Sequence, residues 1–265
     1  MKKILIFTVV AMAFGGAFAN ESSATNAMDM AARKAAASKR FHERTGGFVV
    51  DVQKTKGGIY FVNAAGEAFS KDLAHAAQTL QNDSWLPCKT ATAGDVTIMN
   101  INEKMSLAKW NVAIVLVSND MLPMTIIQPE GRWAFINIEA LKKGNPSEKI
   151  LSSRVKKSAL RAAAFVFGCG YSLNAGGIAT PIAGVEGLDA CLLERLPVDV
   201  FTTMQTLAPK FGITMGKRTY YRNACLEGWA PPPANKYQED IWKQVHSIPD
   251  KPMKIEFDPK RDKDK

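Results

Sequence analysis

Few residues in this sequence have the type and setting that covalent chemistry needs. Cys169 lies between Gly168 and Gly170, and a glycine turn can expose a nucleophilic thiol. A catalytic thiol also needs a lowered pKa and a base, and the C-terminal end of a helix disfavours a thiolate because the helix dipole is negative there. The favoured role of Cys169 is therefore half of a disulfide or a buried thiol.

The Ser-x-x-Lys spacing of serine-acylating enzymes occurs twice, at Ser106/Lys109 and Ser153/Lys156. In those enzymes the lysine lies one helical turn from the serine and accepts its proton, and S-D-N and K-T-G elements complete the site. Neither companion element occurs in this sequence. The two serine–lysine pairs are therefore interpreted as chance spacing.

Apolar runs predict the elements that would position a site. Residues 112–118 (VAIVLVS) and 133–138 (WAFINI) predict buried strands, and residues 95–101 predict a further strand. Residues 147–168 have apolar positions at helical spacing, and Gly168 can end the helix. Strands and helices alternate to about residue 170 and helices dominate afterwards. This order predicts an α/β fold with a mixed sheet, a long central helix and a mainly helical C-terminal subdomain.

The segment 154–171, RVKKSALRAAAFVFGCGY, resembles the active-site helix of the metzincin metalloproteases, and most of all that of the archaemetzincins. In that family a helix carries H-E-x-x-H, then x-x-G and x-x-H. Two histidines one turn apart and a third after the helix break hold Zn²⁺, while the glutamate activates a water. The two strands before the helix also follow that family's order. The resemblance covers about residues 95–175 and implies a metzincin-like fold.

On this sequence the family's motif falls on side chains that cannot hold zinc. The ligand positions are Arg161, Phe165 and Tyr171, the general base is Ala162, and only the helix-breaking Gly168 matches. A guanidinium offers no lone pair, and an alanine cannot accept a proton. The three histidines of the chain lie elsewhere, at His42, His75 and His246. The resemblance therefore implies a pseudoprotease with no catalytic residue, no metal and no other cofactor.

The first residues have the pattern of a secretory signal peptide. Lys2 and Lys3 precede an apolar run over residues 4–14, and Ala17-Phe18-Ala19 is a small-x-small cleavage site. The run is shorter than the roughly 20 apolar residues that a membrane span needs. We predict cleavage after Ala19 and a secreted or periplasmic protein without a transmembrane span.

An exported chain with an even number of cysteines is expected to form disulfides. The candidates are Cys88, Cys169, Cys191 and Cys225, and all three ways of pairing them stay open. The formal net charge is +9, but the basic residues are scattered and do not alternate with aromatic residues as in single-strand binders. No nucleic-acid partner is expected.

We predict five segments along the chain: a signal peptide (1–19), a polar leader (20–46), an α/β domain (47–175), a helical C-terminal subdomain (176–249) and an extended or disordered tail (250–265). Within the subdomain, Trp229 and Tyr237 flank a run of three prolines, Pro231 to Pro233. The two aromatic residues form either a binding surface for a sugar or peptide, or a packed corner of the subdomain.

Three functions follow from these patterns. The leading one is an exported, non-catalytic protein on a metzincin-like scaffold that binds an unknown protein or an envelope polymer. The second is an exported hydrolase whose site the sequence does not reveal. The third is a structural protein of the cell envelope.

Overall fold

The computed structural model describes residues 17–174 and 176–247, with side chains from residue 30 onward. The chain divides into two compact units. One is Phe48–Thr219, and the other combines Met1–Gly47 with Tyr220–Lys265. Each unit is described by itself.

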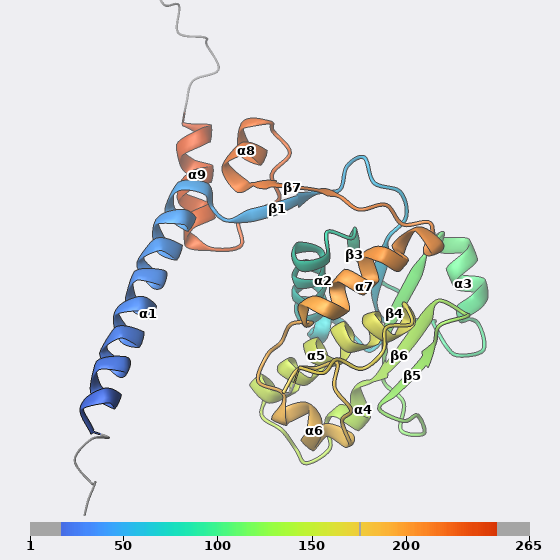
Figure 1. Ribbon diagram of the computed structural model, residues 1–265. Coiled ribbons are helices and arrows are strands. Elements are labelled where there is room, and N and C mark those ends of the chain that lie inside the picture. Colours follow the sequence, from blue (N-terminus) through green and yellow to red (C-terminus); the bar gives the residue numbers. More distant parts are fainter. Residues whose placement is uncertain (1–16, 175, 248–265) are drawn as a thin grey trace, which may run out of the picture. The chain divides into compact units, whose positions relative to one another are not determined.

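A five-stranded mixed sheet forms the centre of the larger unit, in the order β3-β2-β4-β6-β5 (Figure 1). Its strands are β2 (Ile59–Asn63), β3 (Cys88–Thr92), β4 (Val112–Val117), β5 (Thr125–Gln128) and β6 (Trp133–Asn137). β2 pairs in parallel with β3 and with β4, β4 pairs in parallel with β6, and β5 runs antiparallel to β6. The predicted α/β class with a mixed sheet is therefore confirmed.

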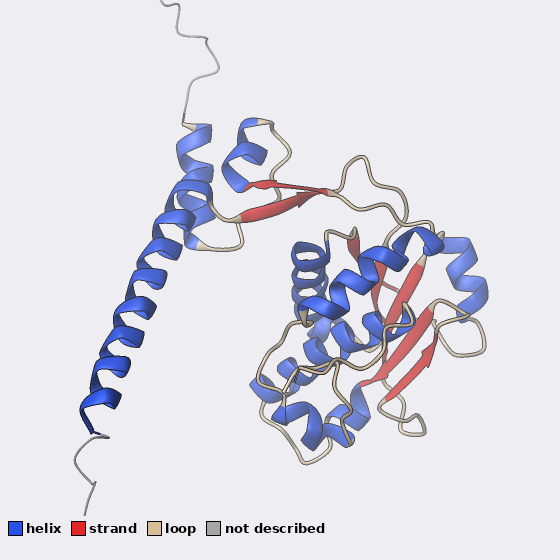
Figure 2. Cartoon of the chain, in the orientation of Figure 1, coloured by secondary structure: helices blue, strands red, loops and turns tan. Residues whose placement is uncertain are grey.

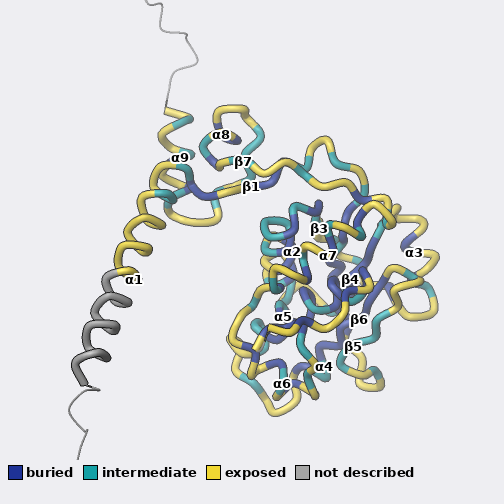
Figure 3. Tube along the Cα trace, in the orientation of Figure 1, coloured by how far each residue is buried: buried dark blue, intermediate teal, exposed yellow. Residues whose placement is uncertain are grey.

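Side chains cover both faces of this sheet, as the central strand β4 shows. Val112, Ile114 and Leu116 belong to one hydrophobic cluster, and the residues between them belong to a second. All of β4 is buried, and β6 is buried with it (Figure 3). Successive side chains of a strand point to opposite faces, so a continuous apolar run needs a covering layer on each side.

Helices supply these layers. The helices of the larger unit are α2 (Ser70–Ser84), α3 (Ile101–Ala108), α4 (Ile138–Leu141), α5 (Glu148–Val166), α6 (Gly184–Ala190) and α7 (Val198–Leu207), with 3₁₀ turns at Glu67–Phe69 and Ala208–Phe211. Helices α2, α5, α6 and α7 contribute to the larger cluster, while α3 contributes Ile101 and Met105 to the other. The helices after the sheet thus pack on the same face as α2 and α5.

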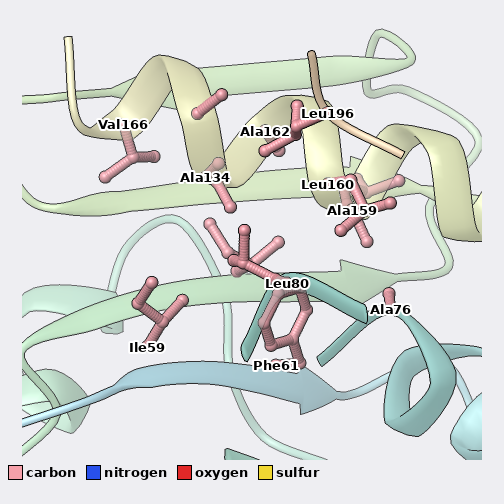
Figure 4. Close-up of a cluster of buried hydrophobic side chains, with 14 of the residues drawn as sticks. Ile59, Phe61, Ala76, Leu80, Ala134, Ala159, Leu160, Ala162, Val166 and Leu196 are labelled. Carbon is pink, nitrogen blue, oxygen red and sulfur yellow. The ribbon is translucent and has the colours of Figure 1, made fainter. Parts of the chain in front are cut away.

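The central helix α5 confirms the prediction for residues 147–168. Ser147 is its N-cap and accepts a hydrogen bond from the amide of Ile150 at 3.5 Å. Gly168 follows the helix with φ +80°, a conformation that glycine adopts without strain. Ala159 and Ala162 of α5 lie against side chains of the sheet in the core (Figure 4). Their small side chains let the helix approach the sheet closely.

One predicted strand is wrong, and the two edge strands of the five-stranded sheet were not predicted. Residues 95–101, predicted as a strand, form turns that lead into α3. The edge strands β3 and β5 were not expected, because none of their residues is buried. A separate two-stranded sheet pairs β1 (Phe48–Asp51) with β7 (Lys217–Tyr220) (Figure 2).

The smaller unit contains α1 (Ala17–Thr45), α8 (Tyr221–Leu226) and α9 (Lys236–His246). Tyr221 is fully buried, and its hydroxyl donates to the carbonyl of Pro231 at 3.1 Å. A side chain at Gly46 would meet the Cβ of Tyr221 at 2.9 Å, so this close approach requires glycine. The side-chain Nε2 of Gln238 donates to the carbonyl of Gly46 at 3.0 Å and joins α9 to the end of α1.

Helix α1 runs from Ala17 to Thr45, so the predicted polar leader (20–46) is helical over most of its length. The predicted signal peptide up to residue 16 and the predicted tail (250–265) lie outside the described residues. Within the described part of the chain, no helix is both long enough and apolar enough to cross a membrane.

Candidate functional site

The three predicted ligand positions lie together at the end of α5. Arg161 and Phe165 are one helical turn apart, and Tyr171 follows the helix break at Gly168. The rings of Phe165 and Tyr171 meet edge to face with centroids 5.5 Å apart. The guanidinium carbon of Arg161 lies 4.6 Å from the Phe165 centroid and 5.8 Å from that of Tyr171. The three side chains form a cation–π cluster, which we call the Arg161 cluster.

Hydrogen bonds fix the guanidinium of this cluster. Nη1 of Arg161 donates to the carbonyls of Ile178 and Thr180, each at 2.6 Å. Burial lowers the pKa of Arg161 from its ordinary value. An arginine nevertheless stays protonated at accessible pH, so the group remains a fixed cation. It ties α5 to the loop that contains Ile178 and Thr180.

The residue at the general-base position is part of the core. Ala162 is fully buried and belongs to the large cluster between α5 and the sheet (Figure 4). Its methyl group can neither accept a proton nor orient a water. These four side chains do not fit a zinc ion: a guanidinium, a phenyl ring and a methyl group offer no lone pair, and only the phenol of Tyr171 has an oxygen.

Two further basic residues of α5 point toward other loops. Arg154 and Lys157 are each only 6% exposed. Arg154 binds Asp189 through two hydrogen bonds of 2.9 and 2.6 Å, and its Nη1 donates to the carbonyls of Leu141 and Lys143. The Arg154 guanidinium holds the pKa of Asp189 below its usual range. This ion pair joins α5 to α6, and the carbonyl contacts join it to the end of α4.

Lys157 binds the carbonyl groups at the end of α6. Its Nζ donates to the carbonyl of Leu188 at 3.2 Å and to that of Cys191 at 2.7 Å. Carbonyls at the end of a helix have no partner within the helix, and a cation there is favourable because the helix dipole is negative. Arg154, Lys157 and Arg161 are spaced by three and four residues, so they share one side of α5. We call them the α5 basic row.

The three histidines lie on other helices. His75 is exposed on α2. Nδ1 of His42 lies 2.8 Å from the carbonyl of Ser38, and Nδ1 of His246 lies 2.8 Å from that of Trp242. Among the residues that the structure describes, no group of three or more His, Cys, Asp or Glu side chains is placed to hold a metal ion.

The structure does not show the predicted disulfides, and all four cysteines are free thiols in it. Sγ of Cys169 points to the carbonyl of Val200 at 3.7 Å, and Sγ of Cys191 points to those of Gly177 and Gly187. Cys88 belongs to β3 and Cys225 to α8. Each thiol is packed in surroundings of its own. Burial raises the pKa of Cys169 to about 11, which also disfavours a nucleophilic role.

Trp229 and Tyr237 do not contact each other's rings within the described part of the chain. The indole N–H of Trp229 donates to Glu227 at 2.6 Å. The ring of Tyr237 faces that of His42 with centroids 5.9 Å apart. A binding surface formed by the two aromatic residues stays a prediction.

The larger unit has a groove that the sequence does not predict. It has a volume of ≈ 880 Å³ and lies between the end of α2, the segment 193–198, α7 and Arg218. Residues more than a hundred positions apart meet in it, and no local pattern in the sequence joins them.

Removing the Arg161 side chain should loosen the loop that it holds. We expect Arg161→Ala to lower the free energy of unfolding by about 2 kcal/mol, since two carbonyls lose a charged donor. Hydrogen exchange should quicken in residues 176–181. Lys149→Ala, an exposed change on the same helix, is the control and should leave both quantities unchanged. A loss below about 0.5 kcal/mol would contradict the structural role of Arg161.

The thiols should behave as free, buried groups. The unreduced protein should show four reactive thiols in guanidinium chloride and no mass deficit from disulfides. In the native protein Cys169 should resist iodoacetamide at pH 8, because a pKa of about 11 leaves about one thiolate in a thousand. Peptide mapping by mass spectrometry measures both. An intact mass short by two or four hydrogens would show that cysteines pair after all.

Comparison with known proteins gives a likeness of fold. No protein-family model matches the chain, and no curated protein matches it. The structure is similar to archaemetzincin from Methanopyrus kandleri, with 13% identity, 57% of this chain and 95% of that chain covered, and a TM-score of 0.45. It is also similar to a zinc-dependent peptidase from Methanocorpusculum labreanum, with 13% identity, 56% and 100% covered, and a TM-score of 0.43. The predicted resemblance to the archaemetzincins thus reappears as a structural similarity over 57% of this chain.

Proposed function

We propose that this chain is an exported, non-catalytic protein on a metzincin-like scaffold, a pseudoprotease that binds a protein partner or an envelope polymer. The observation that carries the proposal is the Arg161 cluster. Arg161, Phe165 and Tyr171 have the spacing of the metzincin ligands and do meet in space, but as a cation–π contact. The cluster supports a structural role for these positions.

The chemistry of the cluster explains why this arrangement would not hydrolyse peptides. Metal-assisted hydrolysis needs lone pairs that hold an ion, a base that activates water, and an open coordination position. The Arg161 guanidinium is a cation already, and both of its acceptors are main-chain carbonyls. Ala162, at the base position, is sealed in the core. A protein that keeps the scaffold without this machinery is best suited to binding.

Zinc content tests the non-catalytic part of the proposal. The wild-type protein should hold less than about one zinc per ten chains and should not cleave a casein substrate. The triple variant Arg161→His, Phe165→His, Tyr171→His should gain about one zinc per chain, because three imidazoles then replace the cluster. Plasma mass spectrometry measures the metal, and circular dichroism establishes that each variant is folded.

The matched control for the triple variant is Phe165→His with Tyr171→His, which keeps the Arg161 cation and should bind no zinc. Stoichiometric zinc or proteolysis by the wild-type protein would overturn the non-catalytic assignment. A folded triple variant that takes up no zinc would show that the three positions do not have the geometry of a metal site.

Export is the part of the proposal that rests on residues 1–19. When the protein is produced in a Gram-negative bacterium, it should be recovered outside the cytoplasm. Its intact mass should be that of a chain that starts at Asn20. Ala19→Arg should block cleavage, because the site requires a small residue, whereas Ala24→Arg should not. A full-length chain in the cytoplasm would contradict export.

A further inference from the structure

The groove in the larger unit contains none of the residues of the Arg161 cluster. Its volume of ≈ 880 Å³ lies within the range of about 300–1,000 Å³ that is usual for ligand sites. The groove runs between the end of α2 and the start of α7, and residues of both helices line it. Its shape alone does not define a ligand, but the side chains around it do.

The walls are apolar, with two half-buried aromatic residues and two exposed aliphatic ones. Trp85, on the α2 side, has φ +60° and accepts a hydrogen bond from Gly216 at its carbonyl, so its position is fixed by the main chain. Phe201 lines the opposite side on α7. Leu193 and Val198 at the edge are 62% and 67% exposed. Aromatic and aliphatic walls of this kind favour apolar side chains of a ligand.

Two arginines line the groove, and they differ in one respect. Arg195 is already paired, because Asp83 accepts from its Nε at 3.0 Å and also from its Nη2. Arg218 lies 3.6 Å above the ring of Phe48 and 5.9 Å from that of Trp85. No carboxylate of the described chain pairs with it. Its guanidinium is held by aromatic rings, and its N–H groups can donate to a carboxylate of a ligand.

Three amide side chains add polar contacts that suit a peptide backbone. Gln205 uses its NH₂ group on the carbonyl of Ser84, and its carbonyl oxygen remains available. Asn174 likewise donates to Asp199. The oxygen of Asn82 accepts from Gln78, which leaves its NH₂ group available. A peptide can match these groups, whereas an acyl chain would leave any that it covers without partners.

We propose that this groove binds a peptide segment that has apolar side chains and ends in a free carboxylate. The carboxylate lies at Arg218, and the apolar side chains pack between Trp85 and Phe201. The inference deepens the proposed function and rests on it, because it names the class of protein partner that a binding protein of this kind would recognise.

The probe is a pool of N-acetylated hexapeptides randomised among alanine, valine, leucine, phenylalanine, serine and asparagine. One pool ends in a free carboxylate and the other in an amide. The full-length protein is incubated with each pool, and retained peptides are identified by mass spectrometry. The wild-type protein should retain the carboxylate pool about tenfold or more over the amide pool, as expected for a charge-assisted pair. Retained peptides should be enriched in apolar residues.

Two variants locate the binding to the groove. Arg218→Gln removes the cation, and Val198→Asp places a negative charge at the edge. Both should lose the tenfold preference. Val198 is the first residue of α7, where an aspartate is favourable for the helix, so this variant should stay folded. Arg132→Gln is the matched control, because Arg132 also lies over an aromatic ring, that of Phe211, but outside the groove. It should behave as the wild type.

Each of the remaining outcomes overturns either the groove proposal or the non-catalytic assignment. No retention, or equal retention of both pools, overturns the groove proposal and leaves a zinc-free, inactive protein consistent with the proposed function. Retention by Arg218→Gln at the wild-type level also overturns it. Dodecanoate that binds and displaces the peptides would assign the groove to acyl carboxylates instead. Cleaved peptides in the retained fraction would overturn the non-catalytic assignment while the groove result stands.

Discussion

The larger unit depends on how α5 satisfies three cations on its packed side. A charged side chain out of water is costly unless it is paired and hydrogen-bonded. Arg154 and Lys157 are almost fully buried. Their hydrogen-bond acceptors are the carboxylate of Asp189 and the main-chain carbonyls of four residues in loops or at helix ends. Arg161 completes the row with two more carbonyls. One helix therefore determines where α4, α6 and the loop after Gly177 can lie.

Burial on both faces explains which elements the sequence could predict. The strands β4 and β6 are buried along their length, so their apolar runs are continuous, and α5 has apolar residues at helical spacing on its buried side; the structure confirms all three elements. The edge strand β3 reads CKTAT and is mostly exposed, and nothing in its composition distinguishes it from a loop. Residues 95–101 show the opposite error. Val96 is a single buried anchor in a turn, yet its β-branched neighbours Thr97 and Ile98 suggest a strand.

The candidate site was predictable in position but not in content. Helical spacing was enough to place Arg161 one turn before Phe165 and to expect a break at Gly168. The partners of Arg161 could not be found in this way, because Ile178 and Thr180 act through their carbonyls and any residue type has one. The groove was even harder to predict from the sequence. Trp85, Phe201 and Arg218 meet only through the packing of α2 against α7 and the course of β7.

The α5 basic row and the groove involve the same segment of the chain, the one that follows α5. Lys157 fixes the end of α6 at Cys191, and Arg161 fixes the chain at Ile178. Gly177 and Leu193, the neighbours of these anchored stretches, line the groove. Ordering a mobile loop on binding costs free energy for each side chain immobilised, so a wall that is already held binds more tightly than one that must be ordered. Because the Arg161 guanidinium holds the carbonyls of Ile178 and Thr180, it also helps to keep the neighbouring wall of the groove in place.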